Sequence, residues 1–427
     1  MKKIKTGLVW FRNNLRLDDN PALNRALELC EYVLLVHVYD TRTFEKQQFN
    51  IDRIGGHRMR FLFQSVEDLS QNLRDNNLYL HTAYDNPINY IKKLVSEYHV
   101  TDIFTQKEAG YEEMIDEKEI KRIANLHLFE SSTLFCKEDL GFSIDQLPKD
   151  FTSFRKKVEK QGFLNPPVDF ERHDAYSIEV PDEKYLYKFS HLMINPHRKT
   201  VYPFTGGETM GNERLKHFIW EDRAIDTYKK TRNNLIGSNY SSKFSPWLAN
   251  GSISPKRIWL EISQYEQIVN KNQSTYWLKF ELLWREFFKW VAYKHPTKFY
   301  LKNGFSKKPI DTATENENFT LWKNGKTANE FINANINELN LTGFMSNRGR
   351  QIVASYLIYD LHVDWRLGAA YFEKMLIDYD TNSNYGNWTY IAGVGNDPRG
   401  GRHFNIEKQR SQYDPNGEYT LLWADAK

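Results

Sequence analysis

The periodicity of the sequence changes near residue 200, and this change constrains the fold more than any other feature. Over about the first 130 residues, short apolar runs alternate with helical patterns, whereas from about Gly206 onward the pattern is helical almost throughout. Strands that alternate with helices favour a doubly wound parallel sheet. The length of 427 residues is comfortable for two domains. We therefore predict an α/β domain at residues 1–130, an interdomain connector at 131–200 and a large all-α domain at 201–427.

Individual elements of both domains are expected from these patterns. The expected strands are Lys5–Trp10, Tyr32–Tyr39, Leu78–Thr82 and Asp102–Thr105. The helices between them are expected at Pro21–Leu29, His57–Arg74 and Ile88–Tyr98. In the second domain, helices are expected at Glu208–Asp222, Pro255–Gln267, Thr275–Tyr293, Thr327–Asn340, Arg348–Asp360 and Arg366–Asp378. The G-x-G-x-x-G fingerprint is missing after the first strand, so the α/β domain gives no sign of binding NAD or FAD in the Rossmann manner.

Composition excludes several classes of protein. No run of about 18 apolar residues exists, so no membrane span is expected. The N-terminal apolar run is typical of a first strand and is too short for a secretory signal, so we expect a cytoplasmic protein. Cys30 and Cys136 are the only cysteines, which excludes a disulfide framework and a cysteine metal site. The net charge of +3 permits a polyanionic partner but is more typical of an ordinary solvated surface.

The segment Tyr228–Ala249 concentrates hydroxyl groups and a lysine in a turn before a helix. Ser241, Ser242, Lys243 and Ser245 could hold a phosphate at the helix N-terminus, where backbone amides favour an anion. Serine-rich turns of this kind are more often ordinary helix caps. Taken alone, this segment therefore leaves both interpretations open.

Three further segments combine aromatic, acidic and amide side chains. In Thr275–Phe288, Glu281, Trp284 and Arg285 fall on neighbouring helical faces, a pattern that an amphipathic core helix also explains. In Thr342–Ser355, Asn347 and Arg350 lie one helical step apart. Asp378 and Asp380 could bind a metal, but no third clustered ligand supports one. We therefore expect no metal site.

These four segments, in this order, resemble the cryptochrome/photolyase family, and YSSKFSPWLA at Tyr240–Ala249 is typical of its DASH branch. The resemblance spans essentially the whole chain and is strongest over residues 200–423. Over residues 1–130 it rests on Gly7–Leu23 and on the α/β pattern. It implies a flavoprotein that uses blue light and FAD to repair cyclobutane pyrimidine dimers in DNA.

The resemblance assigns roles to individual residues around the flavin. It implies that Asn347 and Arg350 touch the flavin ring, that Asp378 pairs with Arg350, that Asp380 accepts a ring N–H and that Asn384 faces flavin N5. Together with these, the implied FAD-binding residues are Tyr228, Ser241, Ser242, Lys243, Phe244, Ser245 and Arg285. The implied catalytic residues are Glu281, Trp284, Asn347 and Asn384.

The resemblance also assigns a lesion pocket. Glu281 matches the carboxyl group that hydrogen-bonds the damaged thymines, and Trp284 matches the aromatic ring that stacks on them. Tyr390 and Gln351 stand where ordinary photolyases usually have Trp and Met. Less apolar stacking surface leaves less energy to extrude a base from a duplex, which costs a few kcal/mol. We therefore expect the protein to prefer lesions in single-stranded DNA.

Three tryptophans match the chain along which the family passes electrons between the flavin and the surface. They are Trp388, Trp365 and Trp322. Three tryptophans in a helical domain are more often core residues, so this role depends on the resemblance. The sequence departs from the family after Trp322, where Glu330 and Asn333 replace the common Pro and Asp.

A second chromophore is implied between the domains. Members of the DASH branch usually hold a folate there, so 5,10-methenyltetrahydrofolate is the expected antenna and Glu108 its candidate acidic contact. Two other functions compete with repair. A signalling photoreceptor with little repair is one, although such cryptochromes often extend far beyond the helical domain and this sequence stops at Lys427. A flavin-free DNA-binding module is the other. We expect a monomer.

Overall fold

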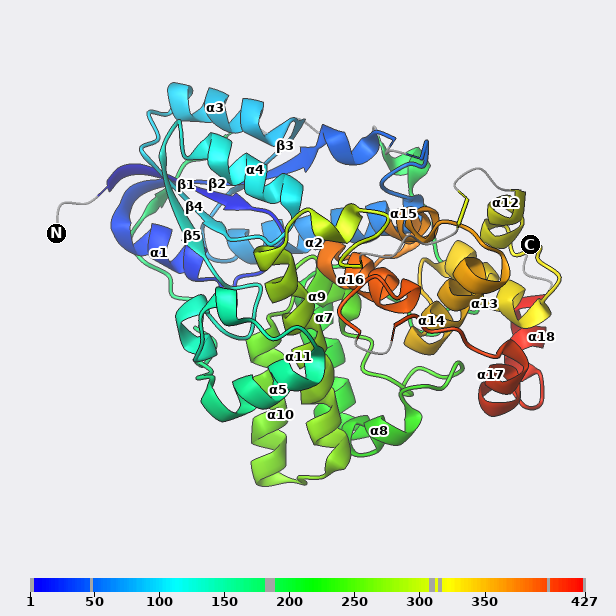
Figure 1. Ribbon diagram of the computed structural model, residues 1–427. Coiled ribbons are helices and arrows are strands. Elements are labelled where there is room, and N and C mark those ends of the chain that lie inside the picture. Colours follow the sequence, from blue (N-terminus) through cyan, green and yellow to red (C-terminus); the bar gives the residue numbers. More distant parts are fainter. Residues whose placement is uncertain are drawn as a thin grey trace.

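Figure 1 shows a sheet-containing domain, drawn in blue and cyan, packed beside a larger helical domain that runs from green to red. This computed structural model describes residues 4–46, 49–180, 189–306, 312–313, 317–397 and 400–424. The strands are β1 (Ile4–Phe11), β2 (Cys30–Asp40), β3 (Leu80–Asp85), β4 (Asp102–Gln106), β5 (Asn125–Phe129) and β6 (Tyr176–Ser177). All pairs are parallel in the order β3-β2-β1-β4-β5, and β6 also pairs with β2. The predicted doubly wound parallel sheet is therefore confirmed.

The helices of the sheet-containing domain include two with ordinary side-chain N-caps. They are α1 (Pro21–Leu29), α2 (Gly56–Arg74), α3 (Pro87–Glu97) and α4 (Tyr111–Ile120). The Asn20 side chain accepts a hydrogen bond from the backbone N–H of Leu23, and Asn86 accepts bonds from Ile88 and Asn89. In both helices a proline occupies the first helical position, where its missing N–H costs nothing. The three predicted helices are thus confirmed to within a few residues.

Two elements of this domain escaped prediction, and one strand was misplaced. Helix α4 is rich in acidic residues and buries only Asp116, Glu117 and Ile120, so it carries no apolar stripe for periodicity to detect. Strand β5 lies at the sheet edge and has no buried residue. Strand β3 begins at Leu80 rather than Leu78 and continues to Asp85.

The connector contains helix α5 (Phe151–Gln161) and the short strand β6. Phe151, Phe154 and Val158 of α5 are buried in the core cluster of the helical domain. Glu286 of the helical domain accepts hydrogen bonds from the backbone N–H groups of Leu134 and Phe135. The connector is therefore fastened to the helices, not only to the surface of the sheet.

The helical domain supplies most of the molecule's buried residues. Its helices are α7 (Glu208–Lys216), α8 (Tyr228–Thr231), α9 (Ser245–Ala249), α10 (Pro255–Ile268), α11 (Gln273–Lys294), α12 (Glu317–Lys323), α13 (Glu330–Thr342), α14 (Asn347–Ser355), α15 (Trp365–Met375), α16 (Thr381–Ala392), α17 (Ile406–Tyr413) and α18 (Glu418–Ala424). Single π-helical turns at His217–Glu221 and Tyr356–Asp360 continue α7 and α14. None of the described helices is long and apolar enough to cross a membrane.

Two predicted helix boundaries in this domain are wrong. Helix α13 begins at Glu330 rather than Thr327, because Asn329 caps it and the Asn333 side chain bonds the backbone and hydroxyl of Thr327 outside the helix. Helix α15 ends at Met375, so Asp378 lies in the turn before α16 and not in a helix. This turn matters because it carries two of the candidate site residues.

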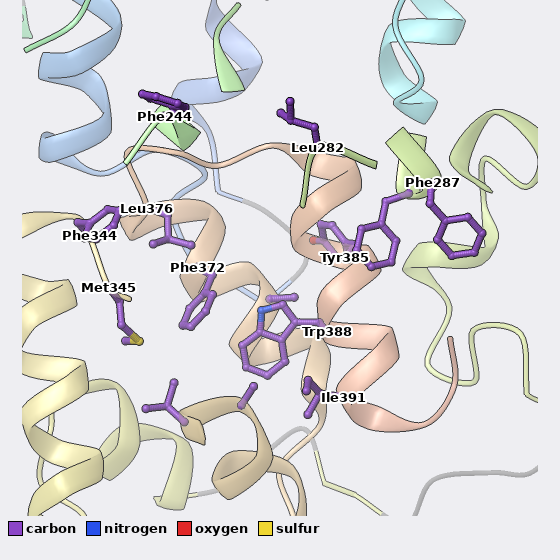
Figure 2. Packing of buried hydrophobic residues seen from close by; sticks show 14 of the residues in the cluster. Phe244, Leu282, Phe287, Phe344, Met345, Phe372, Leu376, Tyr385, Trp388 and Ile391 are labelled. Carbon is purple, nitrogen blue, oxygen red and sulfur yellow. The ribbon is translucent and has the colours of Figure 1, made fainter. Parts of the chain in front are cut away.

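Figure 2 shows the core at the centre of the helical domain, where Trp388 is surrounded by apolar side chains that include Phe372 and Ile391. The rings of Phe372 and Trp388 meet edge to face at 5.1 Å. Gly368 of α15 permits this packing, because a Cβ atom there would lie 2.2 Å from the Trp388 ring. Helices α15 and α16 are therefore locked together at the position of Trp388.

Candidate functional site

Helices α14 and α16 line a small pocket with the turn that precedes α16. Ser346 caps α14 by accepting a hydrogen bond from Gly349 N–H, and Asp380 caps α16 by accepting one from Ser383 N–H. The two caps fix the N-terminal ends of both helices beside each other. The pocket leaves about 90 Å³ of free space and is lined by Asn347, Arg350, Gln351, Asp378, Asp380, Asn384 and Trp388 among others. We call this the ring pocket.

The predicted ion pair of the ring pocket is present. Arg350 Nη2 lies 2.9 Å from Asp378 Oδ2, and the Asp378 side chain is only 1% exposed. Arg350 Nε also donates to the carbonyl oxygen of Met345 at 2.8 Å. Asp378 Oδ1 is buried and has no hydrogen-bond partner within the described residues. An unpaired acceptor of this kind is costly unless a ligand supplies a donor.

Asp380 is held ionised by cationic neighbours. Burial opposes its charge, but Lys289 and Arg285 and the hydrogen bonds from Ser383 outweigh burial and keep the Asp380 pKa below its ordinary value. Lys289 Nζ lies 3.6 Å from Asp380 Oδ2 and its side chain is 3% exposed. Sequence reasoning missed Lys289, because a lysine on an amphipathic helix is normally assigned to the surface.

Asn384 is buried one helical turn after Asp380 and one turn before Trp388. Its side-chain Nδ2 donates to the carbonyl oxygen of Ala369 on α15 at 3.0 Å. This bond fixes the orientation of the amide toward the pocket that it lines. Asn347 and Arg350 line the same pocket from α14. The structure thus brings together five predicted residues, namely Asn347, Arg350, Asp378, Asp380 and Asn384.

The serine-rich segment forms a turn shaped by Arg214. The Arg214 guanidinium donates to the carbonyl oxygens of Ser238, Ser241 and Ser242 and to the side chain of Asn239. Lys243 is 2% exposed, has a left-handed φ of 62°, and donates from Nζ to Ser241 Oγ at 3.0 Å. Burial lowers the Lys243 pKa well below its ordinary value. The structure therefore places Lys243 beside Ser241, as the sequence suggested, and Arg214, which sequence reasoning did not identify, holds the turn in shape.

The expected lesion contacts lie on α11 and α16. Glu281 forms an ion pair with Arg232, a partner that sequence reasoning did not identify. Burial raises the Glu281 pKa, and the positive charge of Arg232 opposes that rise. The Trp284 ring meets the Tyr390 ring edge to face, with 5.6 Å between centroids. We call Glu281, Trp284 and Tyr390 the lesion wall.

Phe151 of the connector backs the lesion wall. Its ring stacks on Trp284 at 3.7 Å with an interplanar angle of 11°. The sequence offered no signal for this contact, since the two residues are far apart in the chain. Gln351, the other residue expected in the lesion pocket, lines the ring pocket with Asn347.

The remaining flavin contacts of the prediction are scattered around these sites. Arg285 donates to the carbonyl oxygens of Ser132 and Leu248, which ties α11 to the connector and α9. Tyr228 is buried on α8, where burial and the nearby Glu281 raise its pKa. Phe244 is 1% exposed and packs edge to face on Phe218. Ser245 begins α9.

The three predicted electron-transfer tryptophans are all buried. Trp388 is 2% exposed, and Trp365 and Trp322 are each 0% exposed. Trp322 meets Trp388 directly at 6.4 Å, whereas Trp365 packs on Tyr385 at 6.2 Å. Trp322 is covered by α14, where Val353 O accepts its ring N–H, so its side chain does not itself reach the surface.

A larger cavity of about 610 Å³ lies between the two domains. The sheet-containing domain contributes Arg12, Asp40, Glu108 and Glu113, and the helical domain contributes Tyr300 and Glu373. Glu108 is 4% exposed and accepts a hydrogen bond from Gln106 Nε2 at 2.8 Å. Tyr379 and Asp380 line both this interdomain cavity and the ring pocket. The two hollows therefore meet at these residues.

Comparisons with known proteins cover both domains. Residues 7–171 match the family model described as DNA photolyase, and residues 277–426 match the FAD binding domain of DNA photolyase. A cryptochrome DASH from Synechocystis is 41% identical over 98% of this chain and 87% of that protein. One from Danio rerio is 41% identical over 99% of this chain and 84% of that protein. The chain belongs to the DASH branch of the cryptochrome/photolyase family.

Solved structures agree with this membership of the DASH branch. The crystal structure of the Synechocystis cryptochrome has a TM-score of 0.92 and 40% identity, covering 99% of this chain and 89% of that one. A class III photolyase from Agrobacterium tumefaciens has a TM-score of 0.83 and 26% identity, covering 99% and 86%. The DASH protein described here is thus a member of a flavin-binding family with the fold of cryptochromes and photolyases.

Proposed function

We propose that this protein repairs cyclobutane pyrimidine dimers, preferably in single-stranded DNA, in a reaction driven by blue light and FAD. One observation carries the proposal: helix α16 presents Asn384 and Trp388 to the ring pocket and Tyr390 to Trp284 of the lesion wall. A cofactor ring in the ring pocket and a lesion on the lesion wall would therefore both lie against helix α16. The family membership supports the same reaction class.

The polar groups of the ring pocket fit a flavin. Asp378 Oδ1 needs a donor, and the ionised Asp380 is an acceptor for a ring N–H. Lys243, Ser241 and Ser242 would hold the phosphates, with Arg214 keeping their turn in shape. The free space of about 90 Å³ in the ring pocket adjoins the larger interdomain cavity at Tyr379 and Asp380.

Repair requires an electron to enter the dimer and then to return. When bound, reduced FAD would supply that electron after absorbing light. The two bonds that join the pyrimidines in the cyclobutane ring break, and the returned electron leaves the reaction redox-neutral. Glu281 would hydrogen-bond the base edge, and the Trp284 face would stack on the lesion. Asn384 places a neutral amide, rather than a charge, beside the ring.

The lesion wall favours substrates that are already unpaired. Tyr390 offers a smaller ring than tryptophan, and Gln351 of the adjoining ring pocket offers an amide where a thioether would add apolar surface. A duplex lesion must first be unstacked, at a cost of a few kcal/mol. A single-stranded lesion avoids much of that cost, so the wall needs to supply less stacking energy.

We propose Trp388, Trp365 and Trp322 as the route by which the cofactor is reduced. Trp388 lines the ring pocket and would donate first. The direct ring contact between Trp388 and Trp322 offers a branch separate from Trp365. Both branches begin in a dry interior, where oxidisable aromatic rings are suitable carriers.

We propose the interdomain cavity as the antenna site, with 5,10-methenyltetrahydrofolate as its ligand and Glu108 among its contacts. The shared lining of the two hollows at Tyr379 and Asp380 would keep the two chromophores close. We further propose that the protein acts as a cytoplasmic monomer on DNA.

The experiment is illumination of the anaerobically reduced protein with dimers placed in a single strand, in a bubble and in a perfect duplex. We expect repair to be fastest in the single strand, intermediate in the bubble and slowest in the duplex. Glu281→Gln should slow repair of the single strand by about tenfold, because a charged hydrogen bond to the base is lost. Flavin bound without light-dependent loss of dimers in any substrate would reject the proposal.

A further inference from the structure

Arg402 reaches back onto Tyr390 of the lesion wall. Its Nη2 donates a hydrogen bond of 2.6 Å to the Tyr390 hydroxyl, and its guanidinium carbon lies 5.1 Å from the centre of the Tyr390 ring. The Arg402 backbone N–H donates to the carbonyl oxygen of Ile391, the residue after Tyr390. The arginine is therefore fastened both to the tyrosine and to the end of the helix that carries it.

The other side of Arg402 is held by a buried carboxylate. Arg402 Nε lies 2.6 Å from Asp397 Oδ2, and the Asp397 side chain is 1% exposed against 25% for Arg402. A guanidinium spreads its charge over one plane, so a single arginine can form an ion pair with the carboxylate and donate a hydrogen bond to the tyrosine at once. Its charge is thus directed into the protein.

The segment that carries Arg402 is itself docked on α14 and its π-helical turn. Phe404 N–H donates to Ser355 Oγ at 2.9 Å, and the His403 ring stacks on the Tyr359 ring at 5.2 Å. Tyr359 also donates from its hydroxyl to Ile391 O at 2.9 Å. Several independent contacts therefore fix the backbone at Arg402 and at the two residues that follow it.

We propose that Arg402 is a positioning residue: paired with Asp397, it holds the Tyr390 ring edge-on to Trp284 and presets the lesion wall. This rests on the proposed function, because the wall is defined by its lesion. A preset wall loses less conformational freedom when a base enters it, which favours binding. Arg402 then acts through Tyr390 and not through the DNA backbone.

The test is a double-mutant cycle on binding of single-stranded DNA with one dimer. Tyr390→Phe keeps the ring and removes the acceptor, and Arg402→Gln removes the guanidinium. We expect each change to weaken binding by up to about tenfold, and the double variant to be no weaker than either single variant, since both remove one contact. Affinity for the undamaged strand should stay unchanged in all three.

Two further measurements separate positioning from a contact with phosphate. A lost phosphate contact would lower the slope of log affinity against log salt by about 0.7 for a single strand, whereas a positioning residue leaves the slope unchanged. Arg402→Lys keeps the charge but lacks the planar set of N–H donors of a guanidinium. We therefore expect it to weaken binding as much as Arg402→Gln does. Additive losses, a reduced salt slope, or near-wild-type binding by Arg402→Lys would each overturn the proposal.

The double-mutant cycle is repeated on the stability of the protein without DNA. Failure of the positioning role can then be told apart from failure of the proposed function. The shift of the urea midpoint caused by Tyr390→Phe should be smaller in the Arg402→Gln background than in the wild type. Arg366→Gln is the matched control, because Arg366 pairs with the buried Asp364 at 2.8 Å without touching Tyr390. Its effect should add to that of Tyr390→Phe. If dimers are not repaired but the coupling between Tyr390 and Arg402 is present, only the repair reaction is rejected. If the effects of Tyr390→Phe and Arg402→Gln on stability are additive, only the positioning role of Arg402 is rejected.

Discussion

The ring pocket and the interdomain cavity meet at Asp380, but the carboxyl groups that only one of them contains differ in their electrostatic setting. In the ring pocket, Asp378 is paired with Arg350 and the Asp380 pKa is held below its ordinary value. In the interdomain cavity, burial and the neighbouring Glu108 raise the Glu113 pKa to about 7. One hollow therefore offers fixed negative acceptors, and the other holds an acid that titrates near neutral pH.

This difference shows how two neighbouring hollows can select different ligands. Ionised acceptors suit a ring that offers N–H donors, as a flavin does. A carboxyl group that retains its proton repels an anionic ligand less and can donate a hydrogen bond. The three predictions below test the two settings separately, beginning with the one expected to have the largest effect.

Asp378→Asn should abolish flavin binding in the ring pocket and lower the stability of the protein. It removes the charge that compensates Arg350, and loss of one partner of a buried pair costs about 3–5 kcal/mol. We expect a protein that is purified without flavin and unfolds at lower urea concentration. Flavin content and the urea midpoint are the measurements.

The matched control for this change is Asp364→Asn. Asp364 is also buried and pairs with Arg366 at 2.8 Å, but it lies outside the ring pocket. It should lower stability while flavin content remains normal. Full flavin content in Asp378→Asn would contradict the assignment of the pocket.

Trp388→Phe tests whether the cofactor in the ring pocket is reduced through Trp388. Phenylalanine fills most of the space but is not readily oxidised, so light-driven reduction of the bound cofactor should fall to the level measured without an external donor. Trp322→Phe and Trp365→Phe compare the two branches beyond Trp388. If reduction continues at the wild-type rate in Trp388→Phe, neither branch begins at this residue.

Glu113→Gln should remove a pH dependence that is confined to the interdomain cavity. The Glu113 pKa rises from 4.5 to about 7, so the group keeps its proton below about pH 7 and becomes charged above it. Its contribution to stability is full below pH 4.5 and is lost as the pH rises through about 7.

Folate is anionic, so its affinity for the cavity should decrease by about three- to tenfold over the same rise in pH. Fluorescence titration with 5,10-methenyltetrahydrofolate measures this affinity. Glu113→Gln should make it independent of pH, while flavin content does not change. A wild-type affinity that is constant between pH 5 and pH 8 would show that Glu113 does not face the bound ligand.

Much of the ring pocket could be predicted from the sequence, because its residues lie in long motifs with a fixed order. Asn347 and Arg350 share one helical face, and the pair between Arg350 and Asp378 is present as expected. The partners that were missed come from distant segments. Lys289, Arg214 and Phe151 act through contacts that no local periodicity encodes.

The fold could be predicted where apolar periodicity was strong. The prediction failed where side-chain hydrogen bonds determine where an element begins. Helix α13 begins late because Asn333 bonds Thr327 outside it, which a hydrophobic pattern cannot show. Helix α4 was missed because its buried face includes Asp116 and Glu117 and so carries no apolar stripe. The direct contact between Trp322 and Trp388 was also missed, because the identity of a tryptophan does not show which rings it will meet.

The central claim is that the ring pocket holds a cofactor which uses light to split dimers on the adjoining wall. The most direct test compares illuminated and dark samples of the reduced, flavin-loaded protein with a single-stranded oligonucleotide that carries one dimer. The account predicts that dimers disappear in the light, stay intact in the dark, and stay intact in light with flavin-free Asp378→Asn. Equal loss of dimers in light and dark, or no loss despite bound flavin, would contradict it.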